Sequence, residues 1–222
     1  MAVTTLPLDP TLDEVRAALA PLIARDAAFD GWSGSAVASA ATQAGVAPEI
    51  ARIAFSGGPV AMVDAWFAHI DGAMLAANPP EVLAEMRVRD RITALIETRL
   101  RLLAPDREAL RRALSVLAMP LNLGKAARLG WRAADLMWRA AGDDAADFNH
   151  YTKRMLLAAV YSATLLVFLD DESDGQTETS AFLARRIADI GRFETRKARM
   201  ATRSEQRPSL ARFVGRLRYH TR

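Results

Sequence analysis

The stretch from Asp147 to Asp171 constrains the fold of this chain more than any other part of it. Its polar first part, residues 147–154, is followed by fifteen uncharged and mostly apolar residues, Met155 to Leu169. A surface helix shows one apolar stripe and one polar face, and this segment shows almost no polar face. Because a membrane span takes roughly 20 apolar residues, we expect it to be too short to cross a bilayer. The pattern predicts a helix buried on all sides, with a polar collar, residues 147–154, at its start.

The composition predicts an all-α fold. Half of the 222 residues (51%) are hydrophobic, which is enough for a sizeable core. Alanine is abundant, β-branched residues are few, and no strand-like alternation persists. The absence of cysteine excludes disulfides and thiolate metal sites. The first ten residues contain no Arg or Lys, so we expect no targeting peptide and a bacterial cytosolic protein.

Charge is divided unevenly along the chain. From Arg192 onward there are ten basic and two acidic residues, a net charge of +8. Residues 1–191 carry 19 basic and 24 acidic residues, a net charge of −5. The high isoelectric point therefore belongs to the C-terminal segment, and it gives no reason to regard the whole protein as a nucleic-acid binder.

Caps, prolines and glycines divide the chain into successive helices. We expect helices at about 11–28, 33–43, 48–55, 59–77, 82–103, 106–118, 125–141, 148–170 and 178–198. We expect three parts: helix-turn-helix-like N-terminal helices (1–56), a helical bundle (57–199) and a basic tail (200–222).

The tail ends in a short basic amphipathic helix. Its apolar residues Leu210, Phe213, Val214 and Leu217 fall on one side of a helical wheel, and Arg212 and Arg216 fall opposite. A helix of about a dozen residues is marginal alone in water. The tail could dock on its own chain, be disordered, or lie in a membrane interface, and the combination of charge and apolar stripe fits the interface.

The first three expected helices resemble the DNA-binding end of TetR-type repressors. The turn at 44–47 and a short third helix ending in Phe55 carry the likeness. In that family a lysine that contacts phosphate usually follows the final aromatic residue, and here Gly58 takes its place. The third helix offers only Arg52 as a cation. Because phosphate contacts supply most DNA affinity, we expect no DNA binding. The alternative function is a TetR-type transcriptional regulator that responds to an apolar ligand.

The sequence contains none of the usual arrangements for catalysis or metal binding. His69, His150 and His220 are far apart, and none lies in the Glu-x-x-His spacing of di-iron bundles. No Ser-His-Asp signature, phosphate loop or dinucleotide-binding fingerprint is present. We therefore expect a protein that is not an enzyme and uses no metal or cofactor.

Arg154 ends the collar at the point where the helix enters the core. A buried arginine needs an anionic partner, because burying it unpaired is costly. That partner could be internal, such as Asp135 or Asp143, or it could be the phosphate or carboxylate of an amphipathic ligand. Small side chains in the helix leave room for a cavity, so a pocket and a plain packed core are both open. A ligand's tail would lie against Met155, Leu157, Ala158, Tyr161 and Leu165.

Several motifs follow one another along roughly residues 10–200. They are Phe29–Trp32, Phe55–Pro59, Ala140–Asp143, Asp147–Arg154, Ala158–Tyr161 and Phe182–Ile187. In this order they resemble the ubiquinone-biosynthesis lipid-binding family, the ninth of the COQ proteins. The resemblance implies a TetR-like fold that does not regulate transcription and that binds lipids and isoprenoid quinone intermediates. It also implies that the cargo is presented to the di-iron demethoxyubiquinone hydroxylase, and that the C-terminal helix touches an anionic membrane.

The resemblance also implies roles for individual residues. The lipid-binding set would be Arg154, at the head group, with Tyr151, Met155, Ala158, Tyr161 and Leu165. The patch that meets the hydroxylase would contain Met137, Trp138, His150 and Tyr151. The family commonly has Trp where this chain has His150. For a bacterial member we expect a peripheral location on the inner face of the membrane, and a homodimer formed through 148–170 and 178–198, as in other TetR-like folds.

Overall fold

The all-α prediction is confirmed. The computed structural model describes residue 7, residues 9–143 and residues 148–190, and every regular element in these ranges is helical. The α-helices within them are α1 (Leu12–Asp30), α2 (Gly34–Ala44), α3 (Pro48–Ala54), α4 (Pro59–Ala77), α5 (Pro80–Ala84), α6 (Val88–Leu103), α7 (Arg107–Leu117), α8 (Leu123–Ala140) and α9 (Phe148–Asp170). Residues 177–190 are also helical.

Helices begin where the local signals predict them. Thr11 and Glu14 form a capping box at α1, in which each side chain accepts a hydrogen bond from the other's backbone N–H, at 3.3 Å and 2.8 Å. Ser33 caps α2 by accepting from the N–H of Ala36. Proline opens α3 and α4, where its missing N–H would have had no helical partner. These starts are fixed by residues next to them in sequence, which is why they could be predicted.

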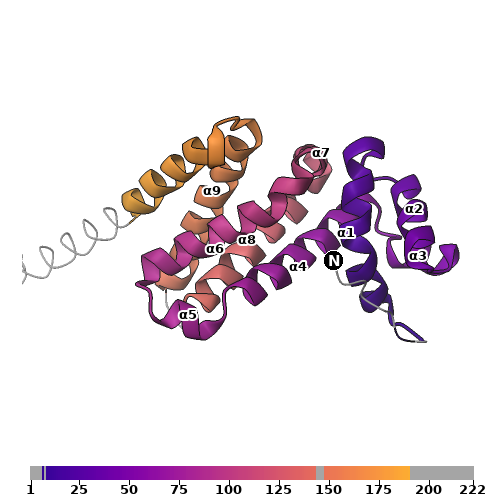
Figure 1. The fold of residues 1–222 in the computed structure, drawn as a ribbon, viewed down its shortest axis with the longest axis horizontal. Coiled ribbons are helices and arrows are strands. Elements are labelled where there is room, and N and C mark those ends of the chain that lie inside the picture. Colours follow the sequence, from indigo (N-terminus) through magenta and orange to yellow (C-terminus); the bar gives the residue numbers. More distant parts are fainter. Residues whose placement is uncertain (1–6, 8, 144–147, 191–222) are drawn as a thin grey trace, which may run out of the picture. The chain divides into compact units, whose positions relative to one another are not determined.

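The first helix joins the helix-turn-helix-like trio to the bundle. As Figure 1 shows, α1 lies beside α2 and α3, and it also packs against α4 and α7. The turn after α2 uses Gly45 at a φ of 67°, in the left-handed region that favours glycine. Trp32, just before α2, donates from its indole N–H to the carbonyl of Ala109 on α7 at 3.1 Å. The trio is therefore anchored to the bundle by both packing and a buried hydrogen bond.

The bundle is built around α4, which packs against α1, α6, α7 and α8. Trp66 of α4 is 1% exposed, and its ring centroid lies 5.3 Å from that of Trp32. Because α8 also packs against α6 and α9, four long helices face one another in this part of the bundle. Their facing side chains form the site described below.

One expected helix, 82–103, is in fact two. The chain breaks between α5 and α6, at residues 85–87, although it has neither glycine nor proline there. Arg91 holds the break: its guanidinium donates to the carbonyls of Ala84 at 3.1 Å, Met86 at 2.9 Å and Ala141 at 2.8 Å. The carbonyls left open at the end of α5 are thereby satisfied.

The prediction that the helix after residue 154 is buried on all sides is wrong. Met155 and Leu166 are 64% and 60% exposed, and they lie on the same face of α9 as Tyr151 of the collar, which is 59% exposed. The opposite face is buried and carries Arg154, Leu157, Tyr161, Leu165 and Phe168. The buried face follows helical periodicity, but apolar residues also occupy the exposed face, and a pattern of apolar and polar residues could not separate the two.

Two helices pass a length and composition test for crossing a membrane, Pro59–Ala77 and His150–Asp170. The second corrects the expectation from sequence, which counted only the apolar residues after Arg154. Core helices of soluble proteins pass the same test, and both helices carry a buried charged residue, Asp71 or Arg154, that is paired inside the fold. We therefore describe both as helices of the bundle.

The chain divides into two compact units, residues 1–183 and residues 184–222. The trio and α4–α9 belong to the first unit. In the second, Arg186 and Asp189 form an ion pair at 3.1 Å. The expected tail residues Leu210, Arg212, Phe213, Val214, Arg216 and Leu217 lie outside the described residues, so their membrane role stays a prediction.

Candidate ligand-binding cavity

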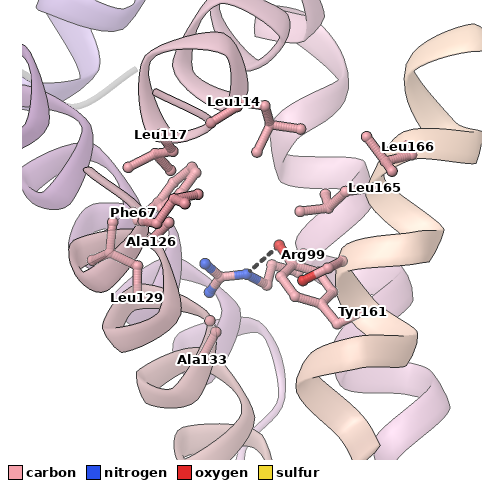
Figure 2. A pocket seen from close by; sticks show the side chains of 14 residues that line it. Phe67, Arg99, Leu114, Leu117, Ala126, Leu129, Ala133, Tyr161, Leu165 and Leu166 are labelled. Atoms are coloured by element: carbon pink, nitrogen blue, oxygen red, sulfur yellow. Dashed lines mark hydrogen bonds between the residues drawn. The ribbon is translucent and has the colours of Figure 1, made fainter. Parts of the chain in front are cut away.

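A cavity of about 270 Å³ lies among α4, α6, α7, α8 and α9. Its wall is mainly aliphatic, and Figure 2 shows leucines from three helices directed toward it: Leu114 and Leu117 of α7, Leu129 of α8, and Leu165 and Leu166 of α9. Such a wall suits an apolar ligand. Ligand pockets are lined mainly by hydrophobic side chains, and a few polar groups fix the orientation of the ligand.

Arg99 of α6 supplies the charged group of this wall. Only 1% of the residue is exposed, and its Nε donates to the hydroxyl oxygen of Tyr161 at 2.7 Å (Figure 2). Its guanidinium carbon lies 5.3 Å from the ring centroid of Tyr161 and 5.9 Å from that of Phe67, within the range of cation–π attraction. Since the Tyr161 oxygen accepts from Arg99, its own proton can be donated to a ligand oxygen.

A chain of ion pairs continues from Arg99 to the outside of the bundle. Arg99 Nη1 is paired with Asp71, and Arg132 Nε lies 3.5 Å from the other oxygen of Asp71. Arg132 is also paired with Asp64, where both side chains are partly exposed. Two arginines and two aspartates cancel in charge, which offsets the cost of placing Arg99 and Asp71 out of water. The cavity therefore has a strongly polar end without a net charge.

The structure places the predicted lipid-binding residues in two groups. Tyr161 and Leu165 line the cavity. Arg154, Tyr151, Met155 and Ala158 are not among its lining residues, and Tyr151 and Met155 are exposed on the other face of α9.

Arg154 has internal partners, one of the two possibilities that the sequence left open. It is 1% exposed, and its Nε donates to Asp135 at 2.5 Å while Nη1 donates to Asp143 at 3.1 Å. The carbonyl of His150 accepts a further bond at 3.3 Å. Arg154 thus ties α9 to α8 and to the turn that follows α8. Its predicted contact with a lipid head group stays a prediction.

Asp143 anchors the same cluster from the turn after α8. Burial by itself would raise the pKa of the Asp143 carboxyl, but hydrogen bonds and charges from Lys153 and Arg154 outweigh it and hold the pKa below its usual value. Lys153 Nζ lies 2.8 Å from Asp143 and 5.3 Å from the ring centroid of Trp138. The backbone carbonyl of Lys153 also accepts from the Trp138 indole at 3.1 Å. The last two residues of the collar, Lys153 and Arg154, are therefore held by ion pairs to the turn after α8.

The residues predicted to meet a partner differ in exposure. Met137 is fully buried and Trp138 is 9% exposed, whereas Tyr151 is 59% exposed. His150 and Tyr151 form an aromatic group with Trp131 of α8, with ring centroids 5.1 to 6.5 Å apart. Tyr151 is therefore the member that offers most area to a partner, and Met137 and Trp138 offer little.

Sequence reasoning missed Arg99, Asp71 and Trp131. A signal for the first two was present: Arg99 falls on the stripe of α6 that is otherwise Ile92, Leu95, Ile96, Leu100 and Leu103, and Asp71 follows Ile70 on the stripe of α4. A charged residue on an apolar stripe indicates a buried pair. Trp131 lies two helical turns before Trp138, which places both on one side of α8.

A second, larger hollow of about 590 Å³ lies among α1, the turn before α4, and α4. Alanines and a glycine make up much of its wall, and its charged residues Asp13, Arg16 and Asp64 are at least partly exposed and already paired. His69 lies at its wall, and burial lowers the pKa of its imidazole. No metal-binding group of three His, Cys, Asp or Glu occurs in the described part of the chain. The smaller cavity, with its buried cation, is the stronger candidate site.

The surface that would read DNA in a helix-turn-helix is apolar here. Ile50 and Ile53 of α3 are 38% and 54% exposed, and Arg52 and Glu49 are the charged residues of this helix. The trio with its caps, residues 11–56, contains five acidic and three basic residues. The net negative charge of the trio repels the phosphates of DNA instead of neutralising them.

The order of helices defines a TetR-like fold. A TetR transcriptional regulator from Nitrosomonas europaea ATCC 19718 superimposes with a TM-score of 0.62, covering 78% of this chain and 96% of that chain at 22% sequence identity. At this identity the likeness establishes the shared fold alone.

Sequence comparisons point to relatives within this fold more specifically than the structure does. Residues 123–194 match the COQ9 family model. The human protein "Ubiquinone biosynthesis protein COQ9, mitochondrial" is 43% identical over 107 residues, which are 48% of this chain and 34% of the human one. The Drosophila melanogaster protein of the same name is 27% identical over 184 residues, 79% of this chain and 55% of that protein. The chain therefore has a TetR-like fold and is similar to COQ9 proteins over part of its length. It spans about a third of the length of the human relative.

Proposed function

We propose that this protein is a non-catalytic accessory protein of ubiquinone biosynthesis that binds isoprenoid quinone intermediates or phospholipid in the α4–α9 cavity. The observation that carries the proposal is an apolar cavity with one buried cation, Arg99, at its wall. Ubiquinone intermediates combine an oxygen-bearing ring with an apolar tail. Arg99 and Tyr161 offer hydrogen bonds to the ring oxygens, and the aliphatic wall suits the apolar atoms that the cavity can hold. The family name of the relatives supports the pathway.

Size supports an aromatic head group as the part that enters. A cavity of about 150 Å³ accommodates benzene, so 270 Å³ accommodates a substituted ring but not a long isoprenoid tail. The ring oxygens would take hydrogen bonds from Tyr161 and Arg99, and the tail would leave past Leu166, which is both a lining residue and 60% exposed. Phospholipid in place of quinone would use the same apolar exit.

A cavity-filling variant tests the site. Gly130 lines the cavity, and a Cβ added at this position would meet nothing within 4 Å. We expect Gly130→Phe to fold, because it removes a mid-helix glycine that costs about 1 kcal/mol. Solvent extraction and mass spectrometry should recover at least about tenfold less lipid from this variant than from the wild type.

Gly72→Phe is the matched control. Gly72 also lies within a helix and has equally open space around it, but it faces solvent outside the cavity. It should retain wild-type amounts of lipid. Recovery of no lipid from the wild type, or of equal lipid from both variants, contradicts the proposed site.

We further propose that the aromatic group His150, Tyr151 and Trp131 contacts the di-iron demethoxyubiquinone hydroxylase, which would collect the cargo. Exposed tyrosines are frequent centres of binding energy, with losses of 2 kcal/mol or more when truncated to alanine. Tyr151→Ala should therefore weaken hydroxylase binding by at least about thirtyfold in a calorimetric titration. Phe29→Ala, at a distant position that is 84% exposed, should leave binding unchanged. Equal affinities for the two variants would place the contact elsewhere.

The alternative function, a TetR-type regulator, has only the fold in its favour. We propose that the protein does not bind nucleic acid, because Ile50, Ile53 and an acidic trio replace the phosphate contacts of a DNA-binding surface. Homodimerisation through α9 and the following helix, and a peripheral place on the inner face of a bacterial membrane, are part of the same proposal.

A further inference from the structure

The connection between α7 and α8 exposes three large apolar side chains within five residues. Leu121 is 96% exposed, Leu123 56% and Met119 54%. We call residues 119–123 the α7–α8 loop. Single exposed apolar residues are ordinary on a protein surface, but a contiguous group marks a surface that meets a partner or a membrane.

The loop has a defined turn that presents these side chains outward. Residues 120–122 form one turn of 3₁₀ helix, and the Asn122 backbone N–H donates to the carbonyl of Met119 at 2.8 Å. The Asn122 side-chain amide donates to the carbonyl of Val116, near the end of α7, also at 2.8 Å. The apolar group is therefore held in place by polar bonds behind it.

Charge around the loop favours an anionic surface. Residues 109–134 contain five basic residues and no acidic one, although residues 1–191 as a whole are acidic. Lys125 and Arg128 are exposed in the first turns of α8. Within the part of the chain that the structure describes, neither forms an ion pair. An apolar tip beside unpaired cations is the combination that binds the interface of an anionic bilayer.

The loop is continuous with the cavity. Leu123 belongs to the loop and also lines the cavity, and the lining residues Leu117 and Ala118 immediately precede it in sequence. An object that covers the loop would therefore also cover one edge of the cavity. A bilayer fits this place better than a protein, because it accepts an apolar group and cations together without requiring a complementary shape.

We propose that the α7–α8 loop inserts Met119, Leu121 and Leu123 into the interface of an anionic bilayer, with Lys125 and Arg128 on the lipid head groups. The loop would act independently of the basic tail. One consequence, that a lipid can pass from the bilayer into the cavity beside the loop, depends on the proposed function. Insertion of the loop itself does not.

A site-specific label can separate the loop from the tail in the full chain. The protein contains no cysteine, so Gly124→Cys provides one attachment point next to the loop and Gly34→Cys a reference point on α2. Both glycines are exposed and have open space around them. Each variant carries an environment-sensitive fluorophore and is mixed with vesicles of equal parts phosphatidylcholine and phosphatidylglycerol that contain brominated acyl chains. We expect quenching of the label at position 124 and none at position 34.

Two further variants test the chemistry with matched controls. In the labelled Gly124→Cys protein, Leu121→Ser should raise the lipid concentration needed for half-maximal quenching by about tenfold. Phe29→Ser should leave that concentration unchanged. Lys125→Glu with Arg128→Glu should raise it by about tenfold or more, whereas the same change in charge at Arg52 and Arg89 should have a small effect.

Three results would overturn the proposal: equal quenching at positions 124 and 34, vesicle binding without quenching at 124, or no vesicle binding. If the fluorescence of the label at position 124 changed with protein concentration in the absence of vesicles, the loop would instead be assigned to an interface between copies of this chain. Gly130→Phe distinguishes this proposal from the proposed function. If that variant and the wild type both lack bound lipid but the label at 124 is quenched, the cavity function fails and the loop stands.

Discussion

Replacing Arg99 with leucine should destabilise the protein by about 3–5 kcal/mol, because it leaves the carboxylate of Asp71 buried without its main partner. Asp71 is 7% exposed, and its second partner, Arg132, lies at 3.5 Å and is itself 39% exposed. Arg132 can therefore compensate for only part of the loss. Urea unfolding followed by circular dichroism measures the effect.

A second variant shows whether the cost comes from the orphaned charge. Arg99→Leu combined with Asp71→Leu replaces the buried pair by apolar side chains, an exchange that is often neutral or stabilising. The double variant should recover most of the stability lost by Arg99→Leu. Arg132→Leu removes a cation from the same carboxylate at a partly exposed position and should cost about 1 kcal/mol or less. A double variant as unstable as the single one would show that Arg99 matters through its packing.

The same double variant separates stability from ligand binding. If it folds as well as the wild type, it presents an apolar cavity without the polar end that Arg99 supplies. We expect it to retain less of a ring-bearing quinone intermediate, because the oxygens of the ring would enter without hydrogen bonds.

The fold could be predicted wherever the determining residues are neighbours in sequence. Thr11, Ser33 and the prolines at 48 and 59 set helix starts through contacts within one turn. The break between α5 and α6 could not be predicted, because it depends on Arg91 reaching the carbonyl of Ala141, fifty residues away.

The site was predictable only in part, for the same reason. Tyr161 and Leu165 were named from the sequence, and both line the cavity. Arg99 was missed because its partners lie on two other helices, at Asp71 and Tyr161. A helical wheel shows that an arginine interrupts an apolar stripe, but it does not show what that arginine meets. Burial on α9 was overestimated because an apolar residue can face either the core or a surface that binds something else.

Replacing Arg154 with alanine should cost about 3–5 kcal/mol at neutral pH, since two carboxylates then lose a buried cation. Asp135 keeps Arg139 at 2.9 Å, and Asp143 keeps Lys153 at 2.8 Å, so the loss is large without being the full cost of two orphaned charges. Arg139→Ala is the matched control. It removes a partner of the same Asp135, but its side chain is 70% exposed, and we expect a cost below about 1 kcal/mol.

Acid should reduce the difference between wild type and Arg154→Ala. The wild-type pKa of Asp143 is held below its usual value, partly by Arg154. A carboxylate with a lowered folded pKa stabilises the fold above its unfolded pKa, and this stability is lost as the pH falls through the folded pKa. In Arg154→Ala the folded pKa of Asp143 lies closer to the unfolded one, so less stability remains to be lost. Unfolding free energies measured from neutral pH into the acid range should therefore converge, and parallel curves would show that Arg154 acts through packing and not through its charge.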